Sequence, residues 1–219
     1  ATQSAAITRA AKPLAAMVLA VLVLVGGFFG YRYFGIGGSA AINSIAVMPF
    51  ENRNSDADTD YLSDGLAESV IFRLTQIPDL RVSPTSSVMR YKGGSTDVAK
   101  IASELGVDAV MTGRLTKRGD NLNITVELVD ARTNKSLWGE QYERKLSELL
   151  TTQREIVAEI VSKLQLKLSG ESEQKLAKKY TDNNEAYQLY LQGRYHWNKL
   201  QINEYEKALE FHMKALNIR

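Results

Sequence analysis

Four aspartates lie close together in the first half of the chain and could bind a hard cation. They are Asp56, Asp58, Asp60 and Asp64. An EF-hand calcium loop needs glycine at its sixth position and glutamate at its twelfth, where this sequence has Tyr61 and Ala67. Acidic residues are also favoured at the positive end of a helix dipole. We therefore interpret these aspartates as solvent-exposed residues at the start of a helix, and we predict no metal site.

Other patterns that could support catalysis or cofactor binding are incomplete. Residues 93–96 (GGST) precede a predicted helix and could hold an anion, but they lack the lysine and the spacing of a P-loop. Both histidines, His196 and His212, lie in a separate helical region near the C-terminal end. Cysteine is absent, which excludes thiolate chemistry, disulfides and Cys-ligated zinc. We predict no catalytic residues and no cofactor.

Aromatic and arginine side chains are better candidates for function, because they concentrate binding energy at protein interfaces. We assign an interaction surface to two groups of them. The first group is Trp138, Tyr142 and Arg144, and the second is Tyr187, Tyr190, Tyr195 and Trp197. The alternative for the first group is packing of a strand face under a helix. For the second group it is the core of helical repeats.

The distribution of charge argues against nucleic-acid binding. Residues 43–170 contain 16 Lys and Arg against 18 Asp and Glu, and residues 171–219 contain 8 against 7. Phosphate contacts dominate affinity for nucleic acids and require a basic excess. Neither region has one. We therefore predict a protein partner or an envelope component as the binding partner, with self-association as a further option.

An uncharged stretch of 19 residues, Pro13 to Tyr31, predicts a membrane anchor. At about 1.5 Å per residue, a helix of this length nearly matches the hydrocarbon thickness of a bilayer. Arg9 and Lys12 precede the stretch and Arg32 follows it, so the positive-inside rule places the N-terminus in the cytoplasm. Residues after about 35 would then lie outside the bacterial cytoplasmic membrane. A cleaved signal peptide and a buried core helix are the alternatives.

The remaining residues predict an α/β domain followed by a helical hairpin. The expected boundaries are a cytoplasmic juxtamembrane segment at 1–12, a transmembrane helix at 13–34, linkers at 35–43 and 171–181, the α/β domain at 44–170 and the hairpin at 182–219. Strands are expected at 44–50, 80–82, 107–115, 122–129 and 136–142. Helices are expected after a polar loop at 51–59, with Asp60 as N-cap, then from 95 to Gly106, and at 148–168. This order predicts a mixed sheet with helices packed on it.

The segment from Asp182 onward has the pattern of two antiparallel helices. Asp182 and Glu185 have the spacing of a capping box. Ala208 and Ala215, seven residues apart in the second helix, are small enough to let two helices approach closely. A repeat hairpin needs neighbours to cover its apolar face, so we expect the natural chain to continue past Arg219.

The α/β region resembles the TolB amino-terminal-like domain. The resemblance is carried by SIAVMPFENRNSDADTDYLSDGLAESVIFRLTQIPDLRV, by ASELGVDAVMTGRLTKRGDNLNITVELVDARTNKSLWGEQYERKL and by EIVAEIVSKLQLKLSG. The tail, YTDNNEAYQLYLQGRYHWNKL and KALEFHMKALNIR, is similar to the tetratricopeptide repeats that follow this domain, although His212 stands where an aromatic residue is usual. The arrangement is similar to the C-terminal half of bacterial transmembrane serine/threonine kinases, and to adenylate cyclases and membrane-bound transcription regulators.

The resemblance implies a sensory or protein-interaction role rather than catalysis within these residues. The glycine-rich loop, lysine and catalytic-loop aspartate of a kinase are not found in the sequence, so a kinase domain would lie upstream. We therefore expect a membrane-anchored, non-catalytic region of a bacterial signalling protein. The alternative is an accessory protein of envelope assembly or trafficking with no intracellular output domain.

Overall fold

The computed structural model describes residues 22–27, 41–54, 57–94, 97–178 and 181–218. Residues 22–27 are helical, and Ile42–Arg219 form a separate unit. The predicted juxtamembrane segment and most of the predicted anchor at 13–34 lie outside the described residues. Within the described part of the chain, no helix combines the length and the apolar character needed to cross a bilayer.

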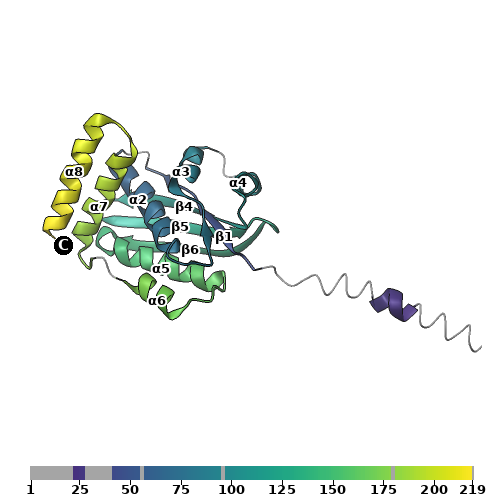
Figure 1. Ribbon diagram of the computed structural model, residues 1–219. Helices are drawn as coiled ribbons and strands as arrows, with labels where there is room; N and C mark the ends of the chain where they lie inside the picture. Colours follow the sequence, from purple (N-terminus) through teal and green to yellow (C-terminus); the bar gives the residue numbers. More distant parts are fainter. Residues whose placement is uncertain (1–21, 28–40, 55–56, 95–96, 179–180, 219) are drawn as a thin grey trace, which may run out of the picture. The chain divides into compact units, whose positions relative to one another are not determined.

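The described residues of the Ile42–Arg219 unit build a mixed sheet of six strands (Figure 1). The strands are β1 (Ser44–Val47), β2 (Glu51–Asn52), β3 (Arg81–Val82), β4 (Ala109–Arg118), β5 (Asn121–Asp130) and β6 (Lys135–Lys145). Their order is β3-β1-β4-β5-β6, with β2 also paired to β4. β1 is parallel to β3 and β4, and β2 is parallel to β4, whereas β4, β5 and β6 form an antiparallel meander. The predicted mixed sheet is confirmed.

The burial of each strand follows from its sequence. All four residues of β1 are buried, as expected of an apolar strand with neighbours on both sides. In β5 the apolar residues that alternate along the strand are buried, and the residues between them are more exposed. The buried set is Leu122, Ile124, Val126 and Leu128. One face of the meander therefore belongs to the core and the other to solvent.

Helices α2 (Ala57–Leu74) and α5 (Leu149–Lys163) lie side by side over the sheet (Figure 1). One side of α2 faces the core. Its side chains are Leu62, Leu66, Val70 and Leu74, and each is fully buried. The shorter helices of the domain are α3 (Thr85–Val88), η1 (Met89–Tyr91), α4 (Val98–Leu105) and η2 (Leu146–Glu148). The helix predicted to end at Gly106 is confirmed as α4, and it begins at Val98 rather than at 95.

The caps of α4 show why that prediction succeeded. The Asp97 carboxylate accepts a hydrogen bond from the Lys100 N–H at 3.1 Å, and Gly106 ends the helix at a φ of 62°. An aspartate N-cap and a left-handed glycine are the strongest local signals of helix ends.

The segment expected to be a polar loop at 51–59 contains regular secondary structure. It holds the short strand β2, and α2 begins at Ala57, so Asp60 lies inside the helix and is not its N-cap. Instead, the Asn52 amide donates to Asp60 Oδ1 at 2.7 Å and to Thr59 Oγ1 at 2.9 Å. β2 is only two residues long, which is too short to produce an alternating pattern in the sequence.

The region after the sheet also differs from the expectation. α5 ends at Lys163 rather than near Leu168, because Gln165 adopts a left-handed conformation with φ of 53°. A further helix, α6 (Gly170–Ala177), occupies most of the range expected to be a linker, and the Ser169 hydroxyl caps it. α6 is short and mostly polar, so few apolar residues recur in it at helical spacing. The pattern of apolar residues therefore did not reveal this helix.

Two antiparallel helices, α7 (Asn184–Asn198) and α8 (Ile202–Asn217), complete the chain (Figure 1). We call them the helical hairpin. The N-cap of α7 is Asn183, whose side-chain oxygen accepts from the N–H groups of Glu185 and Ala186, so the predicted cap at Asp182 is wrong by one residue. The Asn183 amide also donates to the Ile218 carbonyl at 2.7 Å, which ties the two ends of the hairpin together.

Candidate binding site between the sheet domain and the helical hairpin

The hairpin packs directly on α2, through a different side of that helix from the one that packs on the sheet. Gly65 lies where α7 crosses α2, and a Cβ atom at this position would be 3.0 Å from the Leu191 side chain. Leu191 and Tyr187 of α7 are both buried and belong to the same hydrophobic core as the sheet domain. The absence of a side chain at Gly65 thus allows the two helices to approach closely.

Polar contacts from the turn of α2 that follows Gly65 fix this crossing. The Glu68 carboxylate on α2 forms an ion pair with Arg194 on α7 and accepts a hydrogen bond from the Asn198 amide at 3.0 Å. The Tyr187 hydroxyl donates to Ser69 Oγ at 2.9 Å. Residues 65, 68, 69 and 72 recur at helical spacing, so they form one stripe on α2. The stripe positions the hairpin, while the opposite side of α2 packs on the sheet.

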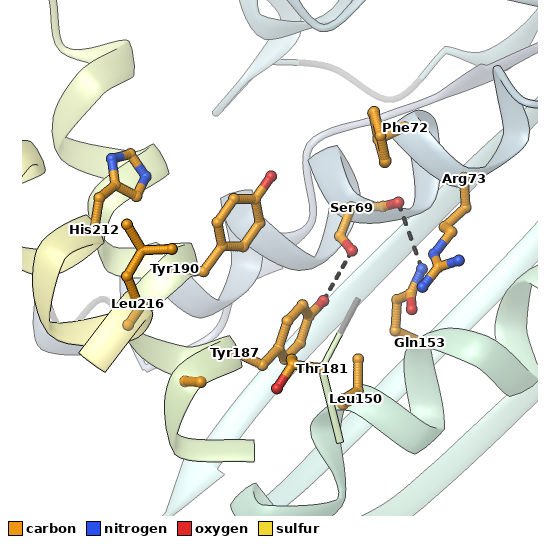
Figure 2. A pocket seen from close by; sticks show the side chains of 12 residues that line it. Ser69, Phe72, Arg73, Leu150, Gln153, Thr181, Tyr187, Tyr190, His212 and Leu216 are labelled. Atoms are coloured by element: carbon orange, nitrogen blue, oxygen red, sulfur yellow. Dashed lines mark hydrogen bonds between the residues drawn. The ribbon is translucent and has the colours of Figure 1, made fainter. Parts of the chain in front are cut away.

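A cavity of about 420 Å³ lies beside this crossing (Figure 2). We call it the junction cavity. Its lining comes from α2, α5, α7, α8 and the segment before α7. The side chains are Ser69, Phe72, Arg73, Leu150, Gln153, Thr181, Ala186, Tyr187, Tyr190, His212, Ala215 and Leu216. In Figure 2, His212, Leu216 and Tyr190 lie on the hairpin side and Phe72 and Arg73 on the α2 side.

Most polar groups in the wall of the junction cavity are already paired. The Arg73 guanidinium donates to the Lys178 carbonyl at 2.7 Å and to the Leu176 carbonyl at 3.3 Å. Gln153 Nε2 donates to the Ser69 carbonyl at 3.4 Å, but Gln153 Oε1 has no hydrogen-bond partner within the described structure. Gln153 Oε1 is therefore a buried acceptor whose hydrogen-bonding capacity is unused.

The electrostatic environment of the cavity favours neutral side chains. Burial raises the pKa of the Tyr187 hydroxyl above its ordinary value of 10.0, so the phenol stays protonated. Burial, together with the nearby Arg194 charge, lowers the pKa of His212 below 6.5, which keeps its imidazole neutral at neutral pH. Apart from the paired Arg73 guanidinium, the cavity thus has apolar and neutral polar walls.

The structure separates the seven residues predicted to form an interaction surface. Tyr187 and Tyr190 lie together at the junction cavity, with their rings stacked at 6.5 Å. Tyr195 and Trp197 lie at the other end of α7, where the Trp197 ring is 5.2 Å from Tyr205 of α8. Trp197 is half exposed.

The first group lies elsewhere, on β6. Trp138 and Tyr142 are buried on one face of that strand, as expected from their spacing, and burial raises the pKa of Tyr142 to about 12. Arg144 forms an ion pair with Glu155 of α5 at 3.3 Å. Arg144 therefore connects β6 with α5, and none of the three side chains lines the junction cavity.

Several residues of the junction were not singled out from the sequence. Ser69, Phe72 and Arg73 lie on α2, whose strong core pattern concealed a second stripe, and Gln153 lies on α5. The available signal was the pair of small residues Gly65 and Ser69, four positions apart on one helix side. Gln153 carried no such signal, because a lone glutamine in an amphipathic helix is usually solvated.

The acidic cluster and the histidines have structural partners. Asp60 is bound by Asn52, and Asp64 forms an ion pair with Lys92 at 2.6 Å, whereas Asp56 lies outside the described residues. Among the residues that the structure describes, no group of three or more His, Asp or Glu side chains could hold a metal ion. His196 Nδ1 is 2.5 Å from Glu204, and its ring stacks on Phe211 at 5.4 Å.

Glu204 holds the turn of the hairpin together. Besides His196, it pairs with Lys207 at 3.0 Å and with Lys199 at 3.3 Å, and these contacts lower the pKa of its carboxyl from 4.5 to about 2, with the His196 hydrogen bond as the largest cause. A lowered pKa stabilises the folded form above the unfolded value of 4.5, and this stabilisation disappears as the pH falls towards 2.

We therefore expect Glu204→Gln to lower the melting temperature at pH 7 and to have a progressively smaller effect as the pH falls from 4.5 towards 2. Thermal unfolding followed by circular dichroism across this pH range is the measurement. Glu210→Gln is the matched control, because Glu210 lies on the same helix and pairs only with Lys214 on the exposed side. A Glu204→Gln effect that persists unchanged at the lowest pH would contradict the assignment.

The outer side of α8 carries an exposed apolar surface. Ile202, Tyr205, Leu209, Met213 and Leu216 recur at intervals of three and four residues, and each is at least 36% exposed. We call this surface the α8 stripe. Ile202 reaches 85% exposure and Leu209 64%. Within the described structure, the hairpin buries only its opposite side, with Ala208 fully buried against α7.

Comparison with solved structures finds α/β proteins of low identity. TolB from Acinetobacter baumannii is 18% identical, with a TM-score of 0.41, over 57% of this chain and 29% of that one. Lipoprotein GNA1162 from Neisseria meningitidis is 21% identical, with a TM-score of 0.40, over 54% and 98%. The PelC dodecamer from Paraburkholderia phytofirmans is 19% identical, with a TM-score of 0.39, over 59% and 91%. These likenesses are too distant to carry a functional argument.

Comparison of sequences gives firmer results. A protein of Rhizobium meliloti (strain 1021) named "Putative adenylate cyclase 3" is 33% identical over 151 residues, which are 69% of this chain and 26% of that protein. The chain thus spans about a quarter of the length of this relative. Residues 40–160 match the family model described as HilA/YgeH-like transcriptional regulator, second domain. Since this match covers more than half of the 219 residues, the chain belongs to the HilA/YgeH-like regulator family through that second domain.

Proposed function

We propose that this chain is a non-catalytic, protein-binding regulatory region of a bacterial signalling protein. The α8 stripe is the observation that carries the proposal, because contiguous exposed apolar side chains on a soluble domain mark an interaction surface. Their spacing of three and four residues fits the apolar side of another α-helix. The occupant of the stripe is therefore a helix, supplied by a partner protein or by another part of the full-length protein.

Two comparisons support a regulatory role for the region. Its family is named for transcriptional regulators, and its relative in Rhizobium meliloti is named as a cyclase of which this region covers 26%. A region shared by proteins with different outputs is expected to sense or bind rather than to carry out the chemistry of either. The output domain is then a separate part of the full-length protein: a nucleotide cyclase or a transcription regulator, or the kinase that the TolB-like resemblance implies.

Anchoring to the bacterial cytoplasmic membrane through Pro13–Tyr31 belongs to the same proposal. It rests on the uncharged length of that segment and on the basic residues before it. Flotation of the full chain with liposomes tests it. We expect the chain to float with the vesicles and a variant with Leu22→Arg and Leu24→Arg to remain at the bottom of the gradient. Equal flotation of both would contradict anchoring by this segment.

The regulatory role is tested in the full-length protein that contains this region. Leu209→Glu with Met213→Glu places two charges on the α8 stripe, and we expect output activity to lose its normal regulation, with a change of several-fold. Cyclic AMP formation is the first output to measure, because of the named relative. Asn203→Glu with Lys214→Glu is the matched control, since these exposed positions lie on the same helix away from the stripe.

A second measurement addresses catalysis directly. The 219-residue chain is incubated with ATP and Mg²⁺, and we expect neither cyclic AMP nor ADP to form. Reproducible turnover that survives repurification would contradict the non-catalytic assignment. Unchanged output by the stripe variant in the full-length protein would contradict the regulatory assignment.

A further inference from the structure

The junction cavity has the size and composition of a small-molecule site. Its volume of about 420 Å³ falls within the range of roughly 300–1,000 Å³ that is usual for such sites. Four helices contribute to its wall, two from the sheet domain and two from the hairpin. Small residues, Ala186 and Ala215, leave the space between the larger rings open.

We propose that the junction cavity binds a small, neutral aromatic molecule that carries a hydrogen-bond donor. We infer that the ligand is aromatic from the two exposed rings at the mouth of the cavity. Phe72 of α2 is 47% exposed and Tyr190 of α7 is 41% exposed, and both line the cavity. Tyr190 also contacts the His212 ring at 6.0 Å. A flat ring between these side chains would gain both burial and aromatic contact.

The hydrogen-bond donor of the ligand is inferred from the unused acceptor of Gln153, a residue that lines the cavity. Gln153 is 1% exposed, and its Oε1 has no hydrogen-bond partner among the described residues. Buried polar atoms are almost always hydrogen-bonded in native proteins, so an unpaired amide oxygen beside a cavity indicates a missing donor. A ligand N–H or O–H at the buried end of the molecule would supply it.

The neutral character follows from the charges around the cavity. The Arg73 guanidinium is engaged by the Leu176 and Lys178 carbonyls, and Arg194 is engaged by Glu68. An anion would therefore have to compete with existing partners, and a cation would face two arginines. A neutral ligand avoids both costs.

Such a ligand would connect the two parts of the unit. It would contact Phe72 and Gln153 on the sheet domain and Tyr190 and Leu216 on the hairpin at the same time. Binding would then stabilise the packing of the hairpin on α2. The site is distinct from the α8 stripe, although Leu216 belongs to both.

The test uses the complete 219-residue chain and the fluorescent probe N-phenyl-1-naphthylamine, which is neutral, aromatic and carries one N–H. We expect saturable binding to one site, with a rise in emission. Ala215→Phe fills the cavity and should weaken binding about tenfold, the equivalent of losing one aromatic contact. Phe72→Ser removes an exposed ring and should have a similar effect, which keeps the test valid if Ala215→Phe fails to fold by circular dichroism.

The donor is tested with a second probe, 1-phenoxynaphthalene, in which an ether oxygen replaces the N–H. The natural chain should prefer the amine several-fold over the ether, and Gln153→Leu should abolish this preference. Leu209→Glu is the control, because it disrupts the α8 stripe without lining the cavity, and it should bind the amine normally. The apolar segment at 13–31 is common to all variants, so a difference between them reports the cavity.

Equal amine binding by the natural chain, Ala215→Phe and Phe72→Ser would overturn the site. An equal loss of both probes in Gln153→Leu would overturn the donor. Loss of binding in Leu209→Glu alone would show that the probe sits on the α8 stripe and would also overturn the site. None of these outcomes depends on the output of the full-length protein.

Discussion

Replacing Gly113 by alanine is expected to lower the free energy of unfolding by about 1–3 kcal/mol, the usual range for overpacking a core. Gly113 lies in β4, and a Cβ atom there would be 2.6 Å from the Phe50 ring, which is itself buried. The Phe50 ring is enclosed by the core and cannot move aside freely. The clash therefore outweighs the roughly 0.5–1 kcal/mol that alanine gains over glycine in a strand.

The chain provides a matched control two strands away. Gly139 lies in β6, on the other side of β5, and a Cβ atom there would meet only the Val126 carbonyl at an ordinary 3.7 Å. Gly139→Ala should be neutral or slightly stabilising in the same urea titration. Phe50→Leu combined with Gly113→Ala should cost less than the sum of the two changes, because the smaller side chain relieves the clash. Additive effects would show that the contact with Phe50 is not the cause.

The sheet could be predicted from the sequence because its signals are local. β5 alternates strictly between apolar and polar residues, and the Gly119-Asp120 turn before it contains a glycine with φ of 59°. The Asp97 and Gly106 caps fixed α4 in the same way. Each of these patterns is contained within ten residues, so no knowledge of the tertiary structure was needed to interpret it.

The junction could not be predicted in this way, because its parts are far apart in the chain. Ser69 and Tyr187 are 118 residues apart, and Glu68 and Arg194 are 126 apart. Tyr187 was singled out as an aromatic residue of interest, but its partner on α2 was hidden within a helix that already had a complete core stripe. Residues 171–181 were also expected to be a linker between modules. Instead they contain most of α6, and the Arg73 side chain attaches this segment to α2 by donating to the Leu176 and Lys178 carbonyls.

The packing of the hairpin on α2 yields the second large effect. Gly65→Leu is expected to release α7 and α8 while leaving the sheet domain folded. Even a Cβ at Gly65 would touch Leu191 at 3.0 Å, so a full leucine side chain has no space at the crossing. Leucine is also a better helix former than glycine, so α2 itself should not be weakened. The lost burial is mainly that of Leu191 and Tyr187, which are 1% and 6% exposed.

Full burial of one such side chain contributes about 1.5–3 kcal/mol. The free energy of local opening of the hairpin should fall by a similar amount, so its amide hydrogens should exchange about 10- to 100-fold faster, while those of β4 and β5 remain protected. Hydrogen exchange followed by mass spectrometry separates the two regions. Gly170→Leu is the control, since it makes the same change at a position where nothing lies within 4 Å of the added Cβ atom, and it should leave the exchange of α7 nearly unchanged. Faster exchange throughout the sheet would mean that the hairpin and the domain unfold together, and unchanged exchange in α7 would mean that Gly65 does not hold the hairpin in place.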